Sequence, residues 1–318
     1  MTAADSSKEH FEIPIIDLSR DEAVVAKELL NAFTKIGFCI VVNHGVDSST
    51  LTNSFASSKA FFDLPLATKQ QYKYQGHTSN RGFIAMGDET HTTPQQPDKK
   101  ETFEIGRNDE PEYPNHWPVE LANEDFKKDF TDYFTTFNEL YLRLMKYIAV
   151  GFDLDPDFFN AKCNGQHCNL RLLHYPEVKK DANMVPVDSN EPIVRGARHT
   201  DYGTLTLLSQ DAIGGLRVQP HGGDWTYVPP VPGGIVINVG DMLQQWTNDV
   251  LQATPHQVVE PPGQSKLIPE RYSIAFFCNA NKECVLDKIE GVSDEPFKYP
   301  PMTAHDYITK RLSETIAG

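Results

Sequence analysis

The chain has 318 residues, of which 39% are hydrophobic and 23% are charged, with 18 Phe and 12 Tyr. This composition supplies enough apolar material for a large buried core and excludes an intrinsically disordered chain. The 29 Lys and Arg residues against 44 Asp and Glu residues give a formal charge of −15. Because this charge repels phosphate backbones and anionic lipid headgroups, we expect neither a nucleic acid nor a membrane surface as a partner.

The N-terminal segment and the cysteines favour a cytoplasmic location. No apolar stretch approaches the ~20 residues that span a bilayer, and the first ten residues lack the basic and then apolar pattern of a secretory signal. The five cysteines are odd in number and include no Cys-x-x-Cys pair. This pattern favours reduced, packed thiols over disulfides or a zinc site. The sequence does not indicate an oligomeric state.

The N-terminal half is predicted to be mainly helical. Its periodicity predicts strands over 13–18 and 38–42, and helices over 21–35, 48–63 and 124–150, the first closed by Gly37. The segment 75–123 is rich in Gly, Pro, Asn and Thr with little periodicity. We therefore expect this segment to be a functional loop.

The C-terminal half changes to short β-type runs separated by Gly, Pro, Asn and Asp. The predicted strands are 170–175, 204–209, 216–219, 225–228, 235–239, 256–259 and 272–278, followed by a helix over 303–316. Regular turn spacing is typical of a sandwich or barrel. We predict one α+β domain over 1–318, with a helical part at 1–165, a β-rich core at 166–302 and a closing helix at 303–318.

The strongest local signal is His199-Thr-Asp201. On an extended strand alternate side chains share a face, so His199 and Asp201 are predicted to point the same way. His256 can complete a set of two histidines and one carboxylate, which holds Fe(II) on three neighbouring positions and leaves three others open. The sequence therefore predicts these three residues as metal ligands and as the catalytic centre.

A second signal follows His256 in Glu270-Arg-Tyr-Ser-Ile-Ala-Phe-Phe277. Arg271 and Ser273 share one face of the predicted strand. The planar guanidinium takes a carboxylate with two parallel hydrogen bonds, and the hydroxyl can add a third. We expect this pair to anchor an anionic cosubstrate.

In this order and spacing, the motifs resemble the 2-oxoglutarate- and iron(II)-dependent oxygenases of the isopenicillin N synthase-like branch. Further matching stretches are Ile13-Pro-Ile-Ile-Asp17, Asn43-His-Gly45, Leu170-Arg-Leu-Leu-His-Tyr-Pro176, Gly214-Gly-Leu216, Asn238-Val-Gly-Asp241 and Trp246-Thr-Asn248. The resemblance implies a double-stranded β-helix (jelly-roll) core with flanking helices. It also implies Fe(II), 2-oxoglutarate and O2, with Arg271, Ser273 and Tyr175 holding 2-oxoglutarate.

Within the branch, several stretches resemble fungal thymine 7-hydroxylases. They include Asn80-Arg-Gly-Phe83, Lys100-Glu-Thr-Phe-Glu-Ile-Gly-Arg107 and Pro114-Asn-His-Trp-Pro118. By that similarity, Arg171, Tyr202, Phe277 and Phe83 are predicted to lie at the substrate, because a planar pyrimidine can stack on an arginine plane or a phenyl ring. Arg171 could instead satisfy a buried carboxylate, and Tyr202 and Phe277 could simply pack the barrel interior.

The resemblance predicts oxidative decarboxylation of 2-oxoglutarate to succinate and CO2, coupled to C–H oxidation of a small planar substrate. A pyrimidine and a fungal-type secondary metabolite both fit, and hydroxylation, desaturation and rearrangement all stay open. One alternative is an oxidase or oxygenase of the same fold that does not use 2-oxoglutarate. Another is a non-catalytic binding protein.

Overall fold

The computed structural model describes residues 11–76, 79–88, 98–122, 125–180, 192–263 and 266–316. Within these ranges the α-helices are α1 (Glu22–Lys35), α2 (Ser48–Phe62), α3 (Leu66–Lys69), α4 (Phe126–Gly151), α5 (Asn160–Cys163), α6 (Asp241–Trp246) and α7 (Ala304–Ile316). Two short 3-10 helices cover Gln70–Tyr72 and Val119–Leu121.

The strands form one large sheet, one smaller sheet and two short pairs. The large sheet has the order β1 (Ile15–Asp17), β2 (Phe38–Val42), β11 (Ile235–Val239), β8 (Leu205–Gln210), β14 (Arg271–Phe277), β5 (Asn169–Tyr175), β4 (Glu101–Ile105) and β3 (Gly82–Ile84). The smaller sheet has the order β10 (Thr226–Tyr227), β9 (Leu216–Val218), β12 (His256–Val259) and β7 (Val194–His199). The short pairs join β13 (Leu267–Ile268) to β6 (Val178–Lys179) and β15 (Val285–Leu286) to β16 (Met302–Thr303).

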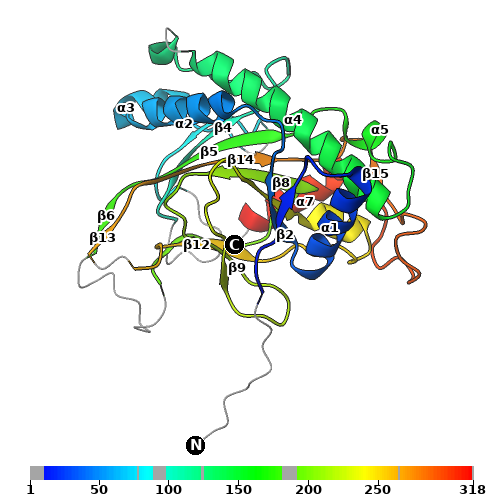
Figure 1. The fold of residues 1–318 in the computed structure, drawn as a ribbon. Coiled ribbons are helices and arrows are strands. Elements are labelled where there is room, and N and C mark those ends of the chain that lie inside the picture. The colour runs from blue at the N-terminus through cyan, green and yellow to red at the C-terminus, as the bar shows by residue number, and fades with distance from the viewer. Residues whose placement is uncertain are drawn as a thin grey trace, which may run out of the picture.

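The two larger sheets face each other across a compact apolar core. This inner core contains side chains from both, including Ile40 and Ala275 of the large sheet and Leu216, Val218 and Val258 of the smaller one. In Figure 1 the strands β9 and β12 accordingly lie across from β5, β8 and β14. The predicted α+β fold with a jelly-roll core is confirmed.

A second core lies on the outer face of the large sheet, which the N-terminal helices cover (Figure 1). The ring of Phe134 on α4 lies 5.0 Å from that of Phe276 on β14, in an edge-to-face arrangement. Tyr133 shares a buried hydrogen bond of 2.8 Å with Ser209 on β8. The helices therefore cover the outer face of the large sheet, and the inner face carries the site.

The predicted helix at 21–35 forms as α1, and its two ends have clear causes. The carboxylate of Asp21 accepts hydrogen bonds from the first-turn backbone N–H groups. Gly37 follows the helix with a φ of +74°, and a Cβ there would lie 2.1 Å from the carbonyl oxygen of Gln252. Only glycine permits this approach. This close approach brings the segment before β12 against the residues that precede β2. There the Thr254 hydroxyl donates to the Ile36 carbonyl at 2.6 Å.

The other predicted helices and strands form within two residues of the expected bounds, but the segment 75–123 differs. It contains β3 and β4, which extend the large sheet beyond β5, so the prediction of a loop is wrong over these strands. Residues 77–78, 89–97 and 123 lie outside the described part. The strand β7 and the helix α6 are further elements that periodicity did not predict. The division into a single domain over 1–318 stays a prediction.

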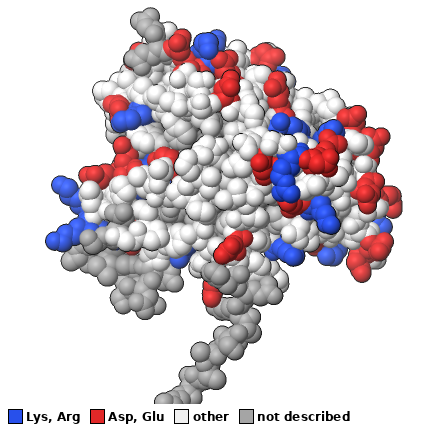
Figure 2. Space-filling view, in the orientation of Figure 1, with Lys and Arg blue, Asp and Glu red and all other residues white. Residues whose placement is uncertain are grey.

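The cysteines are all free, and Cys39, Cys163, Cys168 and Cys278 are buried, as expected. No helix formed by the described residues is long and apolar enough to cross a membrane. On the face in Figure 2, Lys and Arg side chains are interspersed with Asp and Glu. The expectation that nucleic acids and membranes are not partners stays a prediction.

Candidate active site

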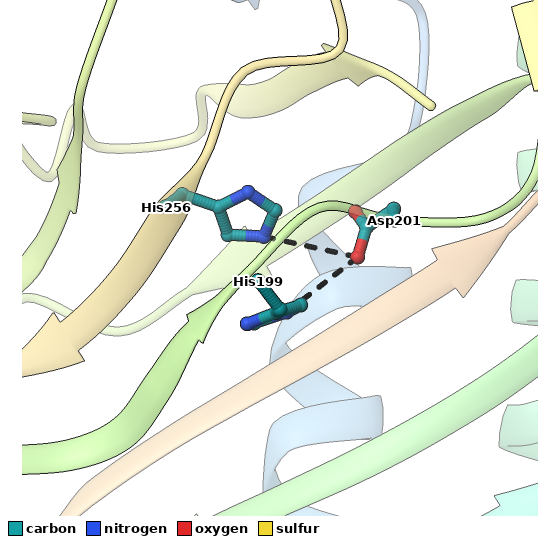
Figure 3. A group of neighbouring side chains, drawn as sticks. All are labelled: His199, Asp201 and His256. Carbon is teal, nitrogen blue, oxygen red and sulfur yellow. Dashed lines mark ion pairs between the residues drawn. The ribbon is translucent and has the colours of Figure 1, made fainter. Parts of the chain in front are cut away.

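His199, Asp201 and His256 converge at one end of the smaller sheet. His199 ends β7 and His256 begins β12, and the two are direct cross-strand partners, with ring centroids 4.3 Å apart. Asp201 lies just beyond β7, so the expectation of a continuous strand through Asp201 is wrong. Even so, its Oδ1 lies 3.7 Å from Nε2 of both histidines, and Figure 3 shows the three side chains turned toward one point.

Backbone carbonyls fix the tautomers of both imidazoles. Nδ1 of His199 lies 2.8 Å from the carbonyl oxygen of Ala197, and Nδ1 of His256 lies 3.1 Å from that of Thr254. Since a carbonyl oxygen only accepts, each Nδ1 carries a proton and each neutral ring presents an Nε2 lone pair. Each of the three residues offers one ligand atom, and these three atoms all lie within 4.8 Å of one another. Two nitrogen lone pairs and a carboxylate oxygen at this spacing fit a divalent metal ion.

The Asp201 carboxylate is buried but stays ionised. Burial raises its pKa, yet His256, His199 and hydrogen bonds from Asn238 and Thr206 outweigh burial and hold the pKa below the usual range. Asn238 donates to Oδ2 at 2.8 Å, which leaves Oδ1 directed at the imidazoles. Asn238 and Thr206 were not predicted as site residues, because nothing local in the sequence places them beside Asp201.

The turn that carries Asp201 is held by α6 and α7. The backbone N–H of Asp241 donates to the Asp201 carbonyl at 2.7 Å, and its carboxylate accepts from the Thr200 hydroxyl at 3.0 Å. Arg311 of α7 forms an ion pair with the same carboxylate. The Arg311 guanidinium carbon also lies 4.6 Å from the ring centroid of Tyr202. Tyr202, a predicted substrate residue, therefore stacks against the C-terminal helix.

Arg271, Ser273 and Tyr175 lie together on the inner face of the large sheet. Arg271 donates to the Ser273 hydroxyl at 2.9 Å and to Oε1 of Gln210 at 3.3 Å. Its side chain is 1% exposed, and its Nε has no hydrogen-bond partner. The guanidinium carbon lies 5.1 Å from the Tyr175 ring centroid. A buried guanidinium with an unused donor suits an anionic ligand, as predicted for 2-oxoglutarate.

Arg171 makes a contact that the sequence left open. Its Nε donates to the carboxylate of Glu104, a fully buried residue on β4, and Asn169 donates to the same carboxylate. The Arg171 guanidinium carbon also lies 5.5 Å from the ring centroid of Phe277. Arg171 thus satisfies a buried carboxylate and still faces a second predicted substrate residue. Glu104 was not predicted as a site residue. The local signal for it is that polar residues flank Phe103, as on a strand with one polar face.

The structure contradicts the prediction for Phe83. Phe83 pairs with Phe103 across β3 and β4, and both rings belong to the outer core. The ring centroids of Phe61 and Phe83 lie 6.0 Å apart there. Phe103 and Glu104 are sequence neighbours on a strand, so they point to opposite faces. Phe83 therefore lies on the far side of the sheet from Arg171 and does not line the predicted substrate site.

Comparison with known proteins identifies the family. Residues 13–120 match the family described as non-haem dioxygenase in morphine synthesis N-terminal, and residues 166–280 match the 2OG-Fe(II) oxygenase superfamily. The proline hydroxylase buaE of Petromyces alliaceus is 33% identical over 93% of this chain and 94% of its own length. The chain belongs to the 2OG-Fe(II) oxygenase superfamily. It is also 31% identical to the 2-oxoglutarate-dependent dioxygenase ecdK of Aspergillus rugulosus, over 88% of this chain and 90% of that protein.

Among solved structures, this oxygenase is similar to the full-length thymine 7-hydroxylase of Neurospora crassa. In complex with alpha-KG and thymine, the Neurospora enzyme is 35% identical, covers 95% of this chain and 97% of its own, and has a TM-score of 0.87. In complex with alpha-KG and 5-formyluracil, it covers 99% and 100% of the two chains with a TM-score of 0.88. The expected resemblance to the fungal thymine 7-hydroxylases is confirmed. The protein is a 2-oxoglutarate-dependent Fe(II) dioxygenase, and Fe(II) and 2-oxoglutarate are its cofactors.

Proposed function

We propose that this oxygenase couples 2-oxoglutarate decarboxylation to oxidation of a C–H bond in a small planar molecule such as a pyrimidine. The observation that carries the proposal is the position of Phe277. Phe277 pairs with Thr206 across β14 and β8, and Thr206 hydrogen-bonds to Asp201. Phe277 therefore lies one strand away from Thr206, the hydrogen-bond partner of Asp201, and Arg171 contacts Phe277. The similarity to the Neurospora enzyme, which was solved with thymine and 5-formyluracil, supports the same substrate class.

We assign His199, Asp201 and His256 as the iron ligands. When bound, Fe(II) supplies the oxidative decarboxylation of 2-oxoglutarate to succinate and CO2 and the oxidation of the substrate C–H bond. The Ala197 and Thr254 carbonyls hold the proton of each neutral imidazole at Nδ1 and leave Nε2 for the metal. Neutral rings and an ionised carboxylate are the protonation states that metal binding requires.

We assign Arg271, Ser273 and Tyr175 to the distal carboxylate of 2-oxoglutarate. Arg271 and Ser273 are each 1% exposed, so a carboxylate bound between them is removed from water. Hydrogen bonds to a charged group are stronger in such surroundings than in solvent. The unused Nε of Arg271 provides a further donor for this anion.

We assign Arg171 and Phe277 as the faces that hold the substrate ring, and Tyr202 as a neighbour at the metal turn. A flat π system is attracted both to a guanidinium plane and to a phenyl ring. Glu104 limits the rotation of Arg171 by holding its Nε. A fixed guanidinium orients the ring without a large loss of side-chain entropy on binding.

The test is a screen for coupled turnover. Protein loaded anaerobically with Fe(II) and 2-oxoglutarate is mixed with oxygenated thymine, uracil or 5-formyluracil, and succinate and oxidised product are both quantified. We expect a pyrimidine to stimulate succinate formation with matching product, and Arg171→Met to reduce that stimulation. Succinate formation that no pyrimidine stimulates would refute the pyrimidine proposal and leave the family unchanged.

A second substrate class is favoured by one comparison. The relative buaE, at 33% identity, is a proline hydroxylase, so L-proline and a proline-containing peptide belong in the same screen. A pyrrolidine ring has no π system to stack on the guanidinium of Arg171 or the ring of Phe277. Stimulation by proline alone, unaffected by Phe277→Leu, would therefore favour this second class over a planar substrate.

A further inference from the structure

Two arginines, not one, lie beside Tyr175 in the interior of the barrel. The guanidinium carbon of Arg271 lies 5.1 Å from the Tyr175 ring centroid, and that of Arg195 on β7 lies 5.3 Å from it. Both side chains are 1% exposed. Gly196, next to Arg195, approaches the same tyrosine, since a Cβ there would lie 3.5 Å from its hydroxyl oxygen. The strand β7 thus places a second cation at the pocket assigned to 2-oxoglutarate.

Neither guanidinium is neutralised by a bonded carboxylate from the described part of the chain. Arg195 donates only to carbonyl oxygens, of Pro269 at 2.9 Å and of Pro176 at 2.6 Å, and its Nε has no partner. The acid that acts on Arg195 electrostatically is Asp211. Its carboxylate accepts hydrogen bonds from the backbone N–H groups of Tyr272 and Ile213 instead.

Arg195 stays charged despite its surroundings. Burial and the nearby charge of Arg271 lower its pKa to about 10, which is still far above neutral pH. Two like charges held in one interior are unfavourable unless an anion joins them. A neutral side chain could donate the hydrogen bonds that Arg195 gives to the Pro269 and Pro176 carbonyls. These structural bonds therefore do not account for the positive charge of Arg195.

We propose that Arg195 supplies the second positive charge of the cosubstrate pocket and selects 2-oxo acids that carry a distal carboxylate. The inference rests on the assignment of Arg271 and Ser273 to that carboxylate. Arg271 forms the direct contact, and Arg195 acts across the Tyr175 ring through its charge. Its influence therefore falls on the distal end of the cosubstrate and not on the end that chelates the metal.

The test compares two ligands on Mn(II)-loaded protein by calorimetry, without turnover. 2-Oxoglutarate carries the distal carboxylate, whereas pyruvate has the same chelating group and lacks it. For Arg195→Gln, which keeps an amide donor but loses the charge, we expect 2-oxoglutarate affinity to fall about tenfold, the effect of one charge at roughly 10 Å in a medium of intermediate polarity. Pyruvate affinity should not change. Arg195→Lys should restore most of the loss, and Arg198→Met, an exposed change on the same strand, should alter neither ligand.

Equal losses for both ligands, or no loss for either, would overturn the proposal and leave Arg195 a structural residue. A second variant tests it without altering Arg195. Arg271→Gln should retain a severalfold preference for 2-oxoglutarate over pyruvate, because Arg195 still acts on the distal carboxylate. Complete loss of that preference would overturn the inference alone. A wild-type protein without any preference would instead overturn the placement of the pocket.

Discussion

Glu104 on β4 lies directly opposite Arg171 on β5, and its buried carboxylate accepts a hydrogen bond from Nε of that guanidinium. Arg171 in turn lies over the ring of Phe277 on β14. Three neighbouring strands therefore contribute one residue each to a row on the inner face of the sheet. The carboxylate at one end of the row determines where the guanidinium can point.

Replacing Glu104 with Gln should weaken substrate binding without affecting the cosubstrate. The amide keeps the shape but removes the charge that orients Arg171, so we expect the substrate KM to rise about tenfold, the worth of one charge-assisted hydrogen bond. The affinity for 2-oxoglutarate should stay the same, and succinate formation should exceed product formation. Steady-state kinetics with both products quantified provide the measurement. The exposed change Glu112→Gln serves as the control, and an unaltered KM in Glu104→Gln would contradict the role given to this pair.

Removing His256 should abolish metal-dependent stabilisation. A metal that binds only the folded state raises the midpoint of thermal unfolding, and loss of one of three ligands should lower Mn(II) affinity at least about 100-fold, beyond the effect of changes around the ligands. Thermal unfolding with and without Mn(II) measures this for His256→Ala. His305→Ala, an exposed change on α7, should keep the full shift. A shift that persists in His256→Ala would place the metal elsewhere.

Arg311→Met should weaken metal binding although Arg311 touches none of the three ligands. The change removes the ion pair to Asp241 and the contact with Tyr202, so the turn around Asp201 becomes less ordered. We expect a loss of Mn(II) affinity of about threefold to tenfold, at the low end for residues around a metal site. Calorimetric titration would measure it. Lys310→Met, the exposed neighbour on the same helix, is the matched variant, and equal affinities in the two would show that α7 does not act on the turn.

The group formed by Glu101, Lys69 and His174 should make stability depend on pH. Burial raises the pKa of Glu101, but hydrogen bonds and charges from His174 and Lys69 outweigh it and the net pKa is lowered. A lowered pKa stabilises the folded state above the ordinary glutamate value of about 4.3, and this stabilisation is lost as pH falls through the folded pKa. Glu101→Gln should therefore cost about 3 kcal/mol at pH 7.

Urea unfolding at pH 7 and at decreasing pH below about 4.3 tests this sign. The difference between wild type and Glu101→Gln should shrink at low pH, because protonation of Glu101 leaves Lys69 unpaired in both. A difference that is constant with pH would indicate that packing, not ionisation, makes the contribution.

The sequence predicted elements with strong local signals and missed those defined by distant partners. The helix at 21–35 has an apolar stripe, an Asp21 cap and a terminal Gly37, and it forms as α1. The strand β4 was not predicted, because it carries the charged residues Glu101 and Glu104, one on each face, which become favourable only beside their partners on β5. Glu104 is an example, since its burial depends on Arg171, 67 residues away.

The site shows the same division. The three metal-binding residues and the Arg271–Ser273 pair could be predicted because residue type and spacing alone carry the chemistry. Phe83 was predicted to lie at the substrate but lies in the outer core, because the face of a strand residue depends on its register with a neighbouring strand. Asn238 and Thr206 were missed, since their role follows only from the pairing of β11 with β8.

The three metal-binding side chains are unequally covered, since that of His199 is 36% exposed whereas those of Asp201 and His256 are 6% and 9% exposed. Of the three side chains, the His199 imidazole is therefore the one that solvent and chelators reach most readily. We expect release of the ion to begin with detachment of the His199 imidazole, while the other two ligands still hold it. The rate at which the enzyme is inactivated by a chelator should then depend on what occupies the space in front of that one ring.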